Sequence, residues 1–152
     1  MSDDILIHRE NRVLTLTFNR LARQNALNAD MLAALAQALE QAAGDDGAHA
    51  VVIQGHETVF TAGRDWPEWI LQTADSGNAG NAANPANPAK SESPAENATE
   101  AAERFMRALA AFPKPVIAAV CGPAVGLGAA LLLHCDLIYA GDNAAFSLPY
   151  VH

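Results

Sequence analysis

Basic residues are scarce in this 152-residue chain, which has nine Lys and Arg against seventeen Asp and Glu and a formal charge of -8. No cluster of cations is available to neutralise phosphates, so the composition argues against a nucleic-acid partner and against an anionic membrane surface. Gly, Pro, His or Asp interrupts every apolar stretch before the roughly 18 residues that a bilayer-spanning helix needs. We therefore expect neither a nucleic-acid nor a membrane partner.

Cysteine is almost missing, since only Cys121 and Cys135 occur and both lie in apolar sequence. Cys121 follows an apolar run and precedes Gly-Pro, a setting more typical of a small buried hydrophobe than of a nucleophile. The first residues carry no basic and apolar leader pattern. These features favour a reducing, cytoplasmic location. No grouping of His, Cys, Asp and Glu has metal-ligand spacing, so we expect no metal site.

Large apolar side chains are nearly absent from about residue 73 to residue 98, where Ala, Asn, Gly, Pro and Ser dominate. Such a segment cannot bury enough surface to offset the entropy of ordering, so we predict a mobile, low-complexity insertion within a single domain spanning 1–152. Order is expected to return at Asn97, because Glu100 completes a capping box before an amphipathic helix. Pro113 and Pro115 should end that helix.

The remaining segments alternate between strand and helix patterns. Residues 5–8 and 13–18 predict a hairpin, and the second run alternates apolar residues with Thr. Apolar positions at helical spacing predict a helix over 29–43, with Asn28 as its N-cap and Gly44 after its end. Residues 50–55 form a short apolar run that indicates a buried strand. The order strand, helix, strand predicts an α/β fold.

A glycine-rich stretch at 121–130 follows the apolar run 116–120, which we interpret as another buried strand. The stretch predicts a turn into a helix N-terminus, where unpaired N–H groups and the helix dipole favour a negatively charged oxygen. The alternative is that these glycines only permit a tight turn and close helix packing. Residues 136–140 and 145–149 are then expected to be extended. No helix follows to cover the last strand, so we expect a truncated product.

Several short motifs resemble those of the crotonase superfamily, the enoyl-CoA hydratases and isomerases, and they occur in the family's order. They are Asn19-Arg20, Asn25-Ala26-Leu27-Asn28, Phe60-Thr61-Ala62-Gly63-Arg64-Asp65, the run 114–122, Cys135-Asp136, and Phe146-Ser147-Leu148-Pro149. The resemblance implies a ββα spiral core that is truncated here before the C-terminal helices. It also implies an acyl-CoA thioester substrate, no cofactor other than the coenzyme A of that substrate, and a homo-trimer or hexamer in the full-length form.

The same resemblance assigns candidate site residues. Family reactions pass through a thioester enolate whose negative oxygen is held by two backbone N–H groups, which map here to Arg64 and Leu127. The residues expected to contact the substrate are Ala26, Ala62, Gly63, Arg64, Asp65, Trp66, Gly126 and Leu127. We expect Asp65 to hold its loop by backbone hydrogen bonds rather than to transfer protons.

Two positions depart from the hydratase pattern. Hydratases resembling this chain carry glutamates where it has Ala130 and Tyr150, and neither residue can replace a carboxylate as acid or base near neutral pH. The Leu-Pro-Tyr sequence resembles the isomerase branch, whose single glutamate lies a few residues past position 152. We therefore expect an isomerase-like full-length parent. Two alternatives stay open, an enoyl-CoA hydratase and a catalytically silent acyl-CoA-binding or assembly fragment.

Overall fold

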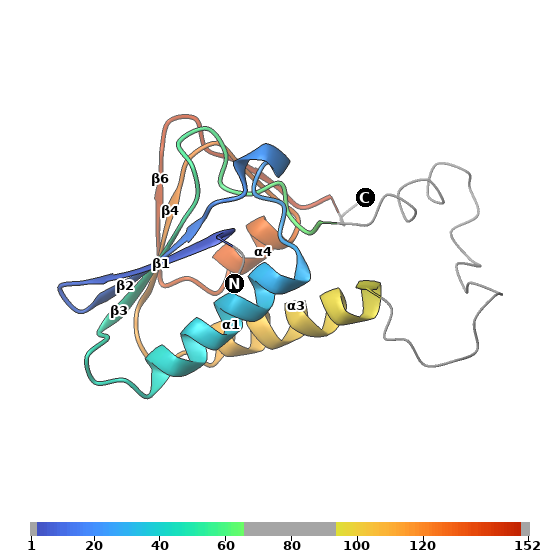
Figure 1. Ribbon diagram of the computed structural model, residues 1–152. Coiled ribbons are helices and arrows are strands. Elements are labelled where there is room, and N and C mark those ends of the chain that lie inside the picture. Colours follow the sequence, from blue (N-terminus) through green and yellow to red (C-terminus); the bar gives the residue numbers. More distant parts are fainter. Residues whose placement is uncertain (1–2, 66–93, 150–152) are drawn as a thin grey trace, which may run out of the picture.

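The computed structural model describes residues 3–65 and 94–149. They form a five-stranded sheet in the order β1-β2-β3-β4-β6, and a separate two-stranded sheet pairs β5 with β7. Figure 1 shows helices α1 and α3 side by side on one face of the large sheet, with α4 on the same side. The apolar core lies between this helical layer and the sheet, because the buried side chains of α1 and α3 join those of β2, β3 and β4 in one cluster. The predicted α/β class is confirmed.

The predicted hairpin is confirmed, with longer strands than expected. Strand β1 (Ile5–Glu10) pairs antiparallel with β2 (Val13–Phe18), and Glu10 lies opposite Val13. Only Asn11 and Arg12 connect them, with φ angles of 49° and 65°. Two successive left-handed residues make the tight turn whose twist matches that of paired strands.

The predicted first helix is confirmed as α1 (Ala29–Ala43). The Asn28 side chain accepts a hydrogen bond from the Met31 N–H at 2.8 Å and caps the first turn. At the other end the Lys114 ammonium donates to the Ala42 carbonyl at 2.6 Å and to the Asp45 carbonyl at 2.8 Å. Strand β3 (Ala50–Gln54) follows and pairs parallel with β2.

Helix α3 (Pro94–Ala110) begins four residues earlier than the capping box predicts, since Asn97 as N-cap would place the first helical residue at 98, so the predicted start was wrong. The sequence gives a reason, because Ser93 and Glu96 form a second pattern of the same kind and proline is favoured in a first helical turn. Residues 94–98 thus belong to a helix rather than to the predicted insertion. The rest of that insertion lies outside the described residues.

Strand β4 (Val116–Val120) pairs parallel with β3 and matches its prediction. Residues 123–125 differ from their prediction. They form a short strand, β5 (Pro123–Val125), where the glycine pattern predicted only a turn. Helix α4 (Leu127–Leu132) then begins, with Gly126 as its N-cap. The glycine at 122 is required, because its φ is 67° and a Cβ there would lie 2.1 Å from the Thr58 carbonyl oxygen.

The last described strands lie at an open edge. Strand β6 (Leu137–Ala140) pairs parallel with β4, and β7 (Ala145–Ser147) pairs parallel with β5. Every residue of both strands is exposed. Their pairing is important for the site, because it fixes where β5 and the start of α4 lie.

Candidate active site

The segment 61–65 runs beside strand β5. The Thr61 N–H donates to the Pro123 carbonyl at 3.0 Å, and the Thr61 carbonyl accepts from the Val125 N–H at 3.0 Å. Two residues later Gly63 has φ 92°, and a Cβ on it would lie 2.6 Å from the Val125 oxygen and 3.8 Å from the Gly126 Cα. Only glycine permits this approach. The segment before Arg64 is thereby brought against the residue before α4.

The other edge of the same segment is bound to the chain around Leu27. The Leu27 N–H donates to the Gly63 carbonyl at 2.7 Å, and the Asp65 N–H donates to the Leu27 carbonyl at 2.9 Å. These two bonds form a parallel bridge centred on Leu27 and Arg64. Both bonds are made by the N–H and carbonyl of Leu27, so in this parallel bridge the N–H and carbonyl of Arg64 point away from Leu27. The Arg64 amide therefore faces the opposite side of the segment, the side on which Thr61 pairs with β5.

The start of α4 supplies the second candidate N–H. Gly126 has φ 55° and ψ -116°, which is a glycine conformation, and its N–H donates to the Ser147 carbonyl at 2.8 Å. The Gly126 carbonyl accepts from the N–H groups of Ala129 and Ala130. The Leu127 N–H has no protein acceptor within residues 3–65 and 94–149. A first helical N–H of this kind can bind an external oxygen.

Thr61 and Asn25 are the buried polar residues that hold these segments together, and both are fully buried. The Thr61 hydroxyl donates to the Asn25 carbonyl at 2.6 Å and accepts from the Gly63 N–H at 3.0 Å. Its methyl group faces α4, because a Cβ on Gly128 would lie 2.2 Å from the Thr61 Cγ2. Close helix packing, one of the two interpretations of the glycines, therefore holds at Gly128.

Asn25 contributes through its side chain as well as its carbonyl. Its Oδ1 accepts from the Arg20 N–H at 2.8 Å, and its Nδ2 donates to the carbonyls of Val59 and Phe60 at 3.3 and 3.2 Å. The residue is left-handed, with φ 54°, a conformation that Asn tolerates better than most residues. Sequence reasoning assigned no role to Asn25 or Thr61. The only signal was their presence inside two motifs.

Asp65 is held differently from the expectation. Its N–H makes the expected backbone bond, but its carboxylate is bound by a side chain: the Arg20 Nη1 donates to the Asp65 Oδ2 at 2.5 Å and to the Ala26 carbonyl at 2.9 Å. The Arg20 Nε also lies 3.7 Å from the Asp4 Oδ2. Arg20 is thus a further residue that sequence reasoning left without a role.

The other predicted contact residues fall around this core. Ala26 and Ala62 are half-buried, and the Ala62 N–H donates to the Gln24 carbonyl at 2.9 Å. Ala130 is half-buried on α4. Trp66 and Tyr150 lie outside the described residues.

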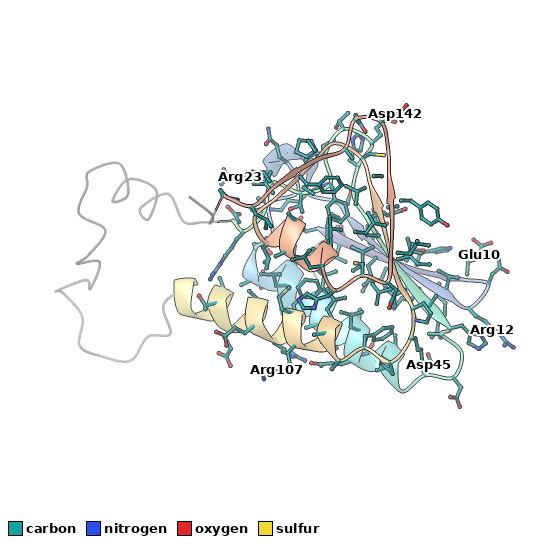
Figure 2. The ribbon with its side chains drawn as sticks, turned by 180° about the vertical axis from the view of Figure 1, so that it is seen from behind. Glu10, Arg12, Arg23, Asp45, Arg107 and Asp142 are labelled. Atoms are coloured by element: carbon teal, nitrogen blue, oxygen red, sulfur yellow. The ribbon has the colours of Figure 1, made fainter. Side chains whose placement is uncertain are left out.

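The carboxyl and thiol groups whose pKa values are shifted lie elsewhere in the molecule. Arg9 lowers the pKa of Asp45 by a hydrogen bond, and Arg104 lowers that of Glu40 in the same way. Figure 2 shows Asp45 at the opposite end of the molecule from Arg23, which belongs to the short 3-10 helix η1 (Leu21–Arg23). Burial raises the pKa of the Cys135 thiol to about 11. Within the described part of the chain, no three His, Cys, Asp or Glu residues are grouped as metal ligands.

Comparison with known proteins identifies the family. The family model described as enoyl-CoA hydratase/isomerase matches residues 8–152, so the chain belongs to the enoyl-CoA hydratase/isomerase family. It is 36% identical over 148 residues to the 2,3-dehydroadipyl-CoA hydratase of Escherichia coli K12, an alignment that covers 97% of this chain and 50% of the hydratase. It is 36% identical over 154 residues to the 1,2-epoxyphenylacetyl-CoA isomerase of the same organism, covering 99% of this chain and 52% of the isomerase.

Solved structures confirm the fold. The structure of Pseudomonas aeruginosa OdaA matches with a TM-score of 0.73 at 40% identity, covering 99% of this chain and 52% of that one. The crotonase-like fold predicted from the motifs is therefore confirmed. The chain spans about half the length of these relatives. Helices long and apolar enough to cross a membrane do not occur in residues 3–65 and 94–149.

Proposed function

We propose that this chain binds an acyl-CoA thioester and holds the thioester oxygen between the backbone N–H groups of Arg64 and Leu127. The observation that carries the proposal is the meeting of two distant segments. Pairing of Thr61 with Ala124 lays the segment containing Arg64 along the strand that leads into Leu127. Family membership supplies the ligand class, since relatives are named as CoA thioester hydratases and isomerases.

The chemistry follows from the charge that develops on the bound oxygen. Removing a proton from the carbon next to a thioester carbonyl leaves an enolate, and the carbonyl oxygen takes most of the negative charge. Two fixed N–H donors stabilise that oxygen more than the neutral carbonyl, which lowers the barrier. Loss of one such donor costs about 3 kcal/mol of transition-state stabilisation. Ala26, Ala62, Gly63, Asp65, Trp66 and Gly126 are the further residues proposed to contact the ligand.

For the full-length parent, the proposed reaction is a double-bond shift rather than hydration. Adding water to an enoyl thioester requires one group to deprotonate water and another to protonate carbon, and Ala130 and Tyr150 occupy the two positions that carry glutamates in similar hydratases. The alternative of a silent acyl-CoA-binding protein is favoured by the same alanine, because it has nothing to titrate. We also propose a cytoplasmic location and, for the full-length form, assembly as a homo-trimer or hexamer.

The test of the oxygen site uses a pair of substitutions at one residue. Proline is well tolerated at the first position of a helix and lacks an N–H, so Leu127→Pro removes the donor while keeping α4. Leu127→Gly keeps the donor and is the matched control. We expect butyryl-CoA bound to the parent chain to show a lowered carbonyl stretching frequency, and only the proline variant to reverse part of that shift. An unchanged frequency in the proline variant would remove Leu127 from the site.

A second experiment tests whether the chain hydrates an enoyl thioester. We expect negligible loss of enoyl absorbance when crotonyl-CoA is mixed with the 152-residue protein. In the longer, full-length form, Ala130→Glu with Tyr150→Glu should raise hydration if the oxygen site is intact, whereas Ala130→Gln with Tyr150→Gln should not. Rapid hydration by the unsubstituted protein would contradict the assignment. Binding without conversion by every variant would favour the silent alternative.

A further inference from the structure

Arg20 lies between strand β2 and helix η1 and keeps its side chain largely covered, with 19% of it exposed. Its position is fixed from two directions. The Arg20 N–H donates to the Asn25 Oδ1 at 2.8 Å, and the Arg20 carbonyl accepts from the Asn25 N–H at 3.0 Å. These two bonds anchor the Arg20 backbone to a buried residue, which fixes the point from which its side chain extends.

The two strongest contacts of this guanidinium lie on either side of the bridge that orients Arg64. One nitrogen, Nη1, donates both to the Ala26 carbonyl at 2.9 Å and to the Asp65 carboxylate at 2.5 Å. Ala26 directly precedes Leu27, and Asp65 directly follows Arg64, which are the two central residues of the bridge. A single cation thus ties the two strands of the bridge together beside their hydrogen bonds.

The charge of Asp65 gives this contact a second effect. A carboxylate on the residue next to Arg64 would raise the energy of a negative oxygen held at the Arg64 N–H, because like charges repel strongly where water is limited. The ion pair with Arg20 offsets that charge, while the Arg20 Nε also lies 3.7 Å from the Asp4 carboxylate. The Arg20–Asp65 ion pair would therefore both orient the Arg64 N–H and weaken the repulsion between the Asp65 carboxylate and a negative oxygen bound there.

We propose that Arg20 is a positioning residue for the thioester oxygen site, acting on the Arg64 N–H through the Ala26 carbonyl and the Asp65 carboxylate. This inference rests on the proposed function for the identity of the ligand. It requires that losing the guanidinium loosens the Leu27–Arg64 bridge locally and weakens the polarisation of a bound thioester. A residue that only supports the fold would instead affect the whole molecule evenly.

The test compares Arg20→Gln and Arg20→Lys with Arg104→Gln. Arg104 makes an exposed ion pair with Glu40 between α3 and α1, so its variant removes a guanidinium of similar type away from the site. We expect Arg20→Gln to speed hydrogen exchange at the N–H groups of Leu27 and Asp65 by about tenfold or more, with no change at Leu16 in the central sheet. Arg20→Lys should be intermediate, because an ammonium lacks the planar fork. Arg104→Gln should leave all three amides unchanged.

The second readout is the carbonyl frequency of bound butyryl-CoA. Arg20→Gln should move it toward the free value, and Arg20→Lys should restore part of the shift. Unchanged exchange at Leu27 and Asp65, or an equal increase at Leu16, would overturn the proposal. If Arg20→Gln does not fold, Asp65→Asn tests the same contact, and parent-like exchange at Leu27 in that variant would also overturn it. If the parent chain gives no carbonyl shift, the proposed function fails while the exchange data still decide the role of Arg20.

Discussion

Thr61→Val isolates the hydrogen bonds that join the candidate site. Valine replaces the hydroxyl by a methyl of similar size, so no cavity forms and the backbone is unaffected. The change removes the donor to the Asn25 carbonyl and the acceptor of the Gly63 N–H. Neither group has a second partner within the described residues. Asn25 and Gly63 are both buried, so water cannot replace the two lost hydrogen bonds.

The expected magnitude follows from those two groups. Each buried group left without a partner costs about 2 kcal/mol, and removing the hydroxyl from the interior returns about 1 kcal/mol. The net loss is about 3 kcal/mol, a large share of the roughly 5 to 15 kcal/mol that stabilises a typical domain. With a urea slope of about 1.5 kcal/mol per molar, the unfolding midpoint should fall by about 2 M.

Urea unfolding followed by far-ultraviolet circular dichroism measures this loss. Thr17→Val is the matched control, because its hydroxyl accepts one bond from the half-buried Gln54 side chain, which can turn to water. The control should change stability by less than about 0.5 kcal/mol. Thr61→Ser keeps the hydroxyl and loses only the methyl against Gly128, so it should cost less than the valine variant. A smaller loss for valine than for serine would refute the hydrogen-bond argument.

Two further predictions concern other parts of the chain. Lys114→Met removes the ammonium that binds the Ala42 and Asp45 carbonyls, and urea unfolding should show a loss of about 2 kcal/mol; a loss under about 0.5 kcal/mol would contradict that role. In a Cys121→Ser background, iodoacetamide at pH 8 should alkylate Cys135 about a hundredfold more slowly in the folded chain than in urea, because burial, and secondarily the next residue's carboxylate, raises its pKa to about 11. Since this pKa is higher in the folded state, the contribution of the protonated Cys135 thiol to folding stability is complete below about pH 9 and is lost between about pH 9 and 11. Equal alkylation rates in the folded chain and in urea would refute the raised pKa.

Local signals in the sequence were sufficient for several elements. The span of α1 followed from apolar residues at helical spacing between Asn28 and Gly44, and Asn28 does cap the helix. The strands at 50–54 and 116–120 followed from short apolar runs. Each of these signals is contained within a few neighbouring residues, which is why no knowledge of the fold was needed.

The errors occurred where the deciding contacts are distant or the local signals compete. Helix α3 had two capping patterns four residues apart, at Ser93 and Asn97, and the proline after Ser93 was the one local signal that favoured the earlier start. Residues 123–125 form a strand because β7, some twenty residues later, pairs with them. A three-residue strand has too little pattern of its own to be recognised before that pairing is known.

The candidate site shows the same division. The motifs by themselves determined the family, the α/β class and the positions to consider, because glycines with positive φ and capping residues are local requirements of the backbone. Only the tertiary structure decided that Thr61 pairs with Ala124, that Asn25 is buried, and that Arg20 reaches Asp65, which is 45 residues away. A buried hydrogen bond depends on which groups folding places side by side without water, and no pattern within one segment contains that information.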